Sequence, residues 1–164
     1  MSELQKCFET AGFENVKTVL GSGNVTFTAR SASRESLERK IEAAMQKSLG
    51  RVFATTVRSI EELAALRAAD PYEKFELAPG AKRVVTLLHE KSQLALKLPI
   101  ELDEARILCV KGTEIFSAYV PSPKGPVFMS LIEKTFGKDL TTRTWDTIGK
   151  VVKAGAPKHK RPAE

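Results

Sequence analysis

The chain has 164 residues, of which 42% are hydrophobic and 28% charged, and its formal net charge at pH 7 is +6. This length and composition allow a buried core and exclude a chain that is disordered throughout. No stretch approaches the roughly 18 to 20 apolar residues of a membrane span, and residues 1–8 carry charges in place of an apolar signal core, so we expect a cytoplasmic protein without a membrane partner.

The first part of the chain, residues 1–58, begins with the pattern of a helix and a hairpin. Apolar residues between positions 4 and 11 fall on one helical face. Residues 16–20 and 24–28 are rich in β-forming side chains. Gly21-Ser22-Gly23 between them supplies the backbone freedom of a tight turn. The pattern predicts two antiparallel strands after the first helix.

A second amphipathic helix and a further strand are predicted next. Apolar residues repeat every three or four positions from Ser33, a plausible N-cap, to Gly50. Residues 53–57 alternate as a half-buried strand does. Ser59 and Glu62 then have the spacing of a capping box and begin a linking helix. The order in this part is therefore helix, strand, strand, helix, strand.

The second part, residues 59–154, has a similar order of predicted elements after its linking helix. Residues 83–88 predict a strand, and residues 107–110 and 115–120 predict a second hairpin. The intervening stretch has helix-forming residues around Pro99, which would interrupt a helix there. Two helices follow, one over residues 127–136 and one marked by Trp145, Ile148 and Val152.

These orders predict an α+β fold of two ferredoxin-like (βαββαβ-type) halves with mostly antiparallel sheets. The first half, residues 1–58, lacks the opening strand, which lies inside the sheet in such a fold. Its absence leaves neighbouring strands with unpaired backbone groups. We therefore expect either a homo-oligomer that pairs or exchanges sheet edges, or a marginally stable monomer.

Residues 155–164 read as a disordered basic tail. They include two prolines and no large apolar side chain. From Lys150 onward five cations face one acid, Glu164, so the rest of the chain is nearly neutral. The cations from Lys158 to Arg161 suit weak, salt-sensitive contact with nucleic acid phosphates. Neither predicted hairpin has the exposed aromatic pairs of single-strand RNA readers, so a solvated tail is the competing interpretation.

Two segments carry a family resemblance. Ser22-Gly23-Asn24-Val25 with Phe27, and the run Thr141-Thr142-Arg143-Thr144-Trp145-Asp146-Thr147, resemble the signature segments of the domain-of-unknown-function 1697 family of uncharacterised bacterial proteins. The resemblance implies a two-part ferredoxin-like architecture and brings no established activity, substrate or cofactor. Family members begin with a strand and a glycine-rich loop that this chain lacks, and they carry asparagines where Thr144 and Asp146 stand here.

The turn formed by Ser22, Gly23 and Asn24 is the first candidate binding element. Backbone N–H groups of a glycine-rich turn can hold a phosphate. A phosphate loop normally opens a helix and has a lysine nearby, whereas residues 25–28 continue as a predicted strand. A simple hairpin turn is therefore the competing interpretation.

Thr142, Arg143 and Trp145 form the second candidate. Thr141 or Thr142 can cap the last helix, and the free N–H groups of its first turn beside Arg143 would then bind an anion. In the competing interpretation the threonines cap, Trp145 packs in the core, and Arg143 pairs with a carboxylate.

No catalytic, metal or cofactor signature is present. His89 and His159 are isolated, Cys7 and Cys109 lie far apart in apolar patterns, and the pair Asp103 and Glu104 belongs to a charged stretch. We therefore assign no catalytic residue, no metal ligand and no cofactor.

The leading hypothesis is a non-catalytic binding or interaction domain with an anion or phosphate site at the start of the last helix. The alternative is an enzyme acting on a small molecule or nucleotide, whose site joins the turn at residues 21–24 to Arg143 and requires both to line one pocket. The third hypothesis is a weak nucleic-acid-binding protein.

Overall fold

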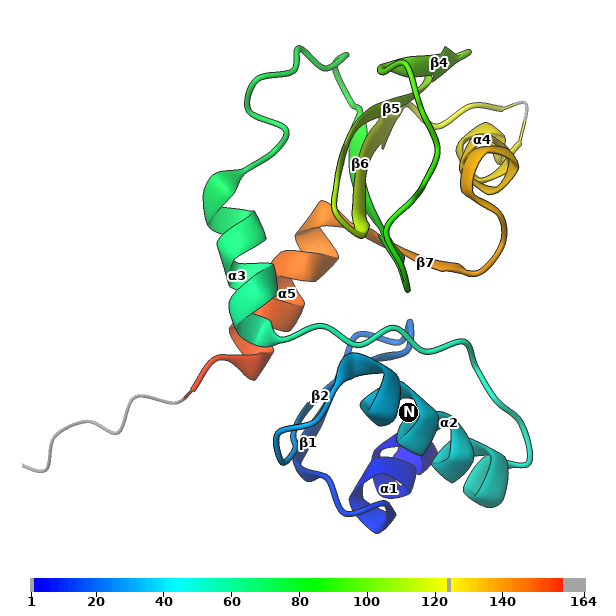
Figure 1. Cartoon of the computed structure of the whole chain (residues 1–164). Helices are drawn as coiled ribbons and strands as arrows, with labels where there is room; N and C mark the ends of the chain where they lie inside the picture. Colours follow the sequence, from blue (N-terminus) through cyan, green and yellow to red (C-terminus); the bar gives the residue numbers. More distant parts are fainter. Residues whose placement is uncertain (1, 124, 158–164) are drawn as a thin grey trace, which may run out of the picture.

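The computed structural model describes residues 2–123 and 125–157. These residues form two lobes, which Figure 1 shows one above the other. The N-terminal lobe comprises residues 2–49, and the C-terminal lobe comprises residues 60–155. An extended connector, residues 50–59, crosses between them. None of the helices in the described part has the length and apolar composition needed to cross a membrane.

The N-terminal lobe contains two helices and a two-stranded antiparallel sheet. Its elements are α1 (Ser2–Thr10), β1 (Glu14–Val19), β2 (Asn24–Thr28) and α2 (Arg34–Leu49). A small core of buried side chains joins the helices to one face of the hairpin, with Phe8, Phe13 and Phe27 in mutual ring contact. Ser33 caps α2 through its hydroxyl, and Gly50 ends it in a left-handed conformation. The predicted helices and hairpin of this lobe are confirmed.

The strand predicted at residues 53–57 is wrong. This segment belongs to the connector and has no strand partner. The N–H of Thr55 donates to the Glu42 carboxylate at 3.3 Å, and the N–H of Val57 donates to the Glu38 carboxylate at 3.0 Å. Side chains of α2 therefore satisfy the backbone groups that a sheet partner would have taken.

The C-terminal lobe is built on a five-stranded antiparallel sheet in the order β4-β5-β6-β3-β7. Its strands are β3 (Lys82–Leu88), β4 (Ile100–Leu102), β5 (Ala105–Lys111), β6 (Glu114–Tyr119) and β7 (Leu140–Thr144). The predicted strand and hairpin are confirmed, and so is the α+β class with antiparallel sheets. The stretch around Pro99 forms no helix and instead leads into β4.

Helices cover both faces of this sheet. α3 (Ile60–Ala69) and α5 (Trp145–Gly155) pack on one face, over a core that includes Leu63, Phe116 and Trp145. α4 (Val127–Phe136) packs on the other face, over a second core. α5 also contacts the hairpin of the N-terminal lobe, and Gly155 passes Ile60 so closely that a Cβ atom would lie 2.4 Å from Cδ1 of Ile60. Helix α5 thus bridges the lobes.

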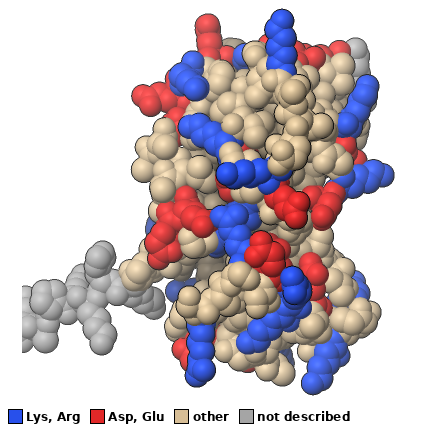
Figure 2. Space-filling view, in the orientation of Figure 1, with Lys and Arg blue, Asp and Glu red and all other residues tan. Residues whose placement is uncertain are grey.

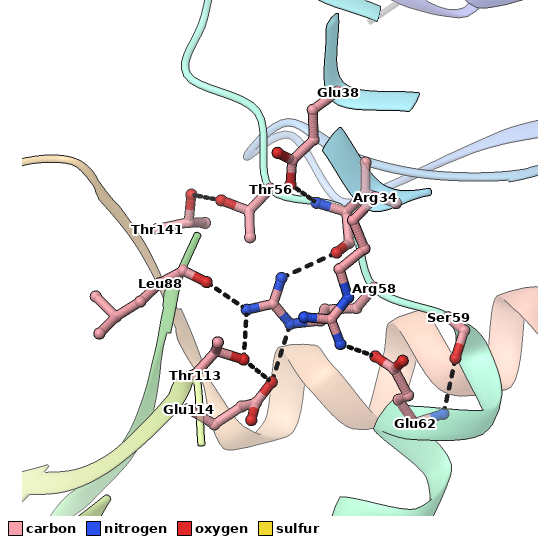
Figure 3. Close-up of polar contacts among 11 residues, drawn as sticks. Arg34, Glu38, Thr56, Arg58, Ser59, Glu62, Leu88, Thr113, Glu114 and Thr141 are labelled. Atoms are coloured by element: carbon pink, nitrogen blue, oxygen red, sulfur yellow. Dashed lines mark hydrogen bonds and ion pairs between the residues drawn. The ribbon is translucent and has the colours of Figure 1, made fainter. Parts of the chain in front are cut away.

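Arg58 fixes the connector against the C-terminal lobe (Figure 3). Its side chain is 2% exposed, and its Nε donates to the Glu114 carboxylate at 2.9 Å. The same guanidinium donates to the Leu88 carbonyl oxygen at 2.6 Å and to the Thr113 hydroxyl at 3.1 Å. Glu114, which is 13% exposed, receives a further hydrogen bond from Thr113. The charge pair is therefore buried with its hydrogen bonds satisfied, which is the condition for a stable buried pair.

Replacing Arg58 by alanine leaves the Glu114 carboxylate buried without a counter-ion. Removing one partner of such a pair typically costs about 3 kcal/mol or more, so we expect Arg58→Ala to lower the free energy of unfolding in urea by that amount. Arg34→Ala is the matched control, because its partner Glu62 is 47% exposed and exposed pairs contribute less than about 1 kcal/mol. Equal losses for the two variants would contradict this account.

Candidate functional site

A groove of about 1670 Å³ lies between the lobes. We call it the inter-lobe groove; its walls include residues 21–32, 53–63 and 140–143. Its described lining includes six cations, Arg30, Arg34, Arg51, Arg58, Lys138 and Arg143, against the four acids Glu3, Glu61, Glu62 and Glu133. Figure 2 shows charged side chains of both signs gathered around the waist between the lobes.

Arg143 joins the turn of the N-terminal hairpin to strand β7. Its Nε donates to Oδ1 of Asn24 at 2.7 Å, and one terminal nitrogen donates to the Ser22 carbonyl oxygen at 2.9 Å. The other terminal nitrogen donates to the carbonyl oxygen of Thr142 at 2.8 Å. Asn24 is oriented by donating its own amide N–H groups to the Val19 carbonyl oxygen and the Ser22 hydroxyl. The two candidate segments therefore meet directly and line one groove.

The hydrogen-bond partners of Arg143 are all neutral oxygens. No carboxylate in the described part of the chain forms an ion pair with it, unlike Arg58. Burial lowers the pKa of Arg143 below its ordinary value, because removal from water disfavours the charged form. A guanidinium still remains protonated at neutral pH. The site thus holds a half-buried positive charge that forms no ion pair with any described carboxylate, beside an open groove.

Gly23 allows the turn to approach this guanidinium. Its φ is +84°, in the left-handed region that favours glycine. A Cβ atom at this position would lie 3.9 Å from a terminal nitrogen of Arg143. The left-handed backbone conformation, and not a lack of space for a side chain, therefore favours glycine at this position.

The start of α5 differs from the sequence interpretation. Thr141 and Thr142 lie in β7, and Thr144 is the N-cap, its hydroxyl accepting from the N–H of Thr147 at 3.2 Å. Thr141 and Thr142 are not caps because β7 continues to Thr144 and α5 begins only at Trp145. The hydroxyls of Thr142 and Thr86 lie 3.4 Å apart across the two strands.

Trp145 lies away from the groove. It is 3% exposed and makes edge-to-face contacts with Tyr72 and Phe116. The Arg67 guanidinium lies 4.8 Å from its ring centroid. Trp145 is therefore part of the core under α3 and α5, and the groove contains Ser22, Gly23, Asn24, Thr142 and Arg143 from the predicted set.

His89 contacts carboxylates from both lobes, which sequence reasoning missed. Its Nδ1 lies 3.2 Å from Oε2 of Glu38 in α2, and its Nε2 lies 3.2 Å from Oδ1 of Asp139. The sequence shows neither contact, because Glu38 and Asp139 lie 51 and 50 positions from His89. None of the residues that line the groove is a histidine or cysteine among those described.

The metal-binding and thiol groups of the described residues are as follows. They include no group of three or more His, Cys, Asp or Glu side chains arranged to hold a metal ion. Cys7 and Cys109 are free thiols, and burial raises the pKa of Cys109. Less of its reactive thiolate therefore forms at neutral pH. Burial likewise raises the pKa of Tyr72, whose hydroxyl donates to the Val84 carbonyl oxygen.

Comparisons with known proteins give a family match and a solved structure of similar fold. The sequence profile of a family described as "Protein of unknown function (DUF1697)" matches residues 1–116. A solved structure, that of the conserved bacterial protein SP0830 from Streptococcus pneumoniae, resembles this chain with a TM-score of 0.67 and 20% sequence identity, covering 94% of this chain and 88% of that one. At this identity the similarity concerns the fold alone. No curated protein matches the chain in sequence.

The burial of Trp145 gives a direct test of its role. Truncating a fully packed aromatic side chain costs about 3–5 kcal/mol, so we expect Trp145→Ala to lower the free energy of unfolding, followed by circular dichroism, by that amount. Phe53→Ala is the control, because Phe53 is 51% exposed and exposed positions usually change stability by about 0.5 kcal/mol or less. A Trp145→Ala protein as stable as the control would show that the indole does not belong to the core.

Proposed function

The chain belongs to the DUF1697 family of proteins of unknown function, and from this premise we propose a non-catalytic binding domain that takes an anionic ligand in the inter-lobe groove. The observation that supports the proposal is the state of Arg143. This side chain is half-buried, its pKa is lowered by burial, and its partners are the neutral oxygens of Ser22, Asn24 and Thr142. A carboxylate or phosphate would supply the missing counter-charge.

The chemistry of the guanidinium defines the class of ligand. Arginine carries N–H groups beyond the three hydrogen bonds present here. Its planar fork matches the oxygens of a carboxylate or phosphate group. These features favour binding along the β7 wall, near Thr142 and Arg143, over the start of α5 where Thr144 already caps the helix.

An enzyme acting on a small molecule or nucleotide is the second candidate. The observation in its favour is that the turn at residues 21–24 and Arg143 line one groove, as that hypothesis requires. Carboxylates and a lysine line the groove, although no described lining residue is a histidine or cysteine, so our preference for binding rests on the state of Arg143. Turnover of a metabolite in an activity screen, abolished by Arg143→Gln, would reverse this preference.

For the architecture we propose two ferredoxin-like halves. In the C-terminal lobe the strand order β5-β6-β3-β7 supports this assignment, with the segment containing β4 in place of the first helix. In the N-terminal lobe the helices and hairpin fit this assignment, and none of the described residues forms a strand between β2 and the connector. Domain limits at residues 1–58 and 59–154 follow from the same division.

Two partner proposals accompany this one. The open edge of β2 supports self-association of the chain through its sheet. Weak nucleic-acid contact by the basic tail remains a proposal from composition alone, because Lys158, Lys160 and Arg161 lie outside the described residues. Helix α5 itself extends to Gly155, the first residue of the predicted tail.

Anion binding is tested by titrating the ¹⁵N-labelled protein with inorganic phosphate and with AMP, and following amide and arginine side-chain resonances. We expect the resonances of Arg143 and of residues 22–24 to shift. Arg143→Gln removes the charge, and Asn24→Asp supplies an internal counter-ion. Each variant should weaken binding by about tenfold or more, since hydrogen bonds to charged groups contribute about 1.5–3 kcal/mol.

Arg51→Gln is the matched control for this titration. Arg51 also lines the groove, and it lies over the exposed ring of Phe53. We expect this variant to keep the affinity of the unmodified protein. Equal weakening by Arg51→Gln and Arg143→Gln would point to a diffuse charge effect, and an absence of shifts at residues 22–24 and Arg143 would refute the site.

A further inference from the structure

The outer edge of β2 is an unprotected strand edge. β1 pairs with one side of β2, and none of the strands in the described chain pairs with the other side. Proteins usually protect such an edge with charged side chains, prolines or bulges. Residues Asn24–Thr28 include no charged residue and no proline. This edge is therefore able to accept another strand.

The space beside this edge is walled by a second extended segment. Connector residues 53–58 line the same groove as β2. Leu37, Leu49 and Val57 also line it and are only partly buried, although they pack against the core of the N-terminal lobe. A two-stranded sheet is marginal in isolation. An added strand with apolar side chains on one face would cover these residues and continue the sheet.

Residues Ser92–Lys97 have the sequence of such a strand. Leu94 and Leu96 alternate with Gln93, Ala95 and Lys97, which is the period of an amphipathic strand. The segment forms neither helix nor strand, and Leu94 is 52% exposed. Leu98, which directly follows the segment, packs against the core of the C-terminal lobe. The segment is thus an unpaired strand sequence tethered to its own lobe.

The segment does not lie in the groove of its own chain, because none of residues 92–97 belongs to the described lining. We propose that two copies of the chain associate by placing Ser92–Lys97 of each copy against the free edge of β2 in the other, as a third strand. Leu94 and Leu96 then face the apolar side of the groove beside Leu37 and Val57, and Gln93 and Lys97 face away from it.

The exchange is reciprocal, so a two-fold axis closes the assembly at a dimer. Both copies gain backbone hydrogen bonds along β2, and both cover an exposed leucine. This inference rests on the self-association proposed above and names the segment responsible for it. Both proposals use the inter-lobe groove, but mass and amide protection are separate readouts from the phosphate titration that tests anion binding at Arg143.

The experiment measures the mass of the full chain by sedimentation over a wide range of protein concentration. We expect a monomer–dimer equilibrium. Leu94→Lys should raise its dissociation constant by about tenfold or more, because it places a charge against an apolar surface. Leu102→Lys is the matched control: Leu102 is 44% exposed and lies on β4, outside the segment. It should leave the equilibrium unchanged.

Hydrogen exchange of the unmodified protein gives a second readout that needs no variant. Amide protection of residues 24–28 and 92–97 should rise together as the dimer forms. A dimer that survives Leu94→Lys, with protection elsewhere, would overturn the role of this segment and leave self-association standing. A monomer at every concentration would overturn both.

Discussion

The burial of Arg58 between the connector and the C-terminal lobe is the constraint on which the arrangement of the lobes depends. A guanidinium that is 2% exposed is costly to bury unless its charge and its N–H groups are satisfied. Glu114, Thr113 and the Leu88 carbonyl oxygen meet that requirement from the C-terminal lobe. These hydrogen bonds therefore fix the end of the connector against the C-terminal lobe. In that position the connector forms one wall of the inter-lobe groove.

The contrast between Arg58 and Arg143 locates the candidate site. Arg58 joins the connector to the C-terminal lobe and is almost fully buried, whereas Arg143 joins the two lobes and is half-buried. Arg58 has a carboxylate partner at 2.9 Å, whereas the partners of Arg143 are an amide oxygen and two carbonyl oxygens. In the first arrangement the two charges neutralise each other, so removing either partner would destabilise the fold. The second leaves a positive charge beside a groove, which is the arrangement that binds anions.

Sequence reasoning succeeded where the determining interactions are local. Ser33 and Ser59 accept from N–H groups three residues ahead, so capping was readable from spacing. It failed where contacts between residues far apart in the sequence determine the local structure. At residues 53–57 the N–H groups of Thr55 and Val57 donate to Glu42 and Glu38 of α2 and not to a strand partner. Pairing with β3 extends β7 to Thr144, so the last helix begins later than a cap at Thr142 would place it. The two site segments were found, but their contact through Asn24 spans 119 positions and has no local signal.

The most direct measurement of the central claim is the thermal stability of the unmodified protein and of Asn24→Asp in phosphate and in chloride at equal ionic strength. A ligand that binds the folded state alone raises the midpoint of unfolding. If Arg143 lacks a counter-ion, phosphate stabilises the unmodified protein specifically, and Asn24→Asp abolishes most of that increment. Equal midpoints in the two salts, or the same increment in both proteins, would contradict an anion site at Arg143.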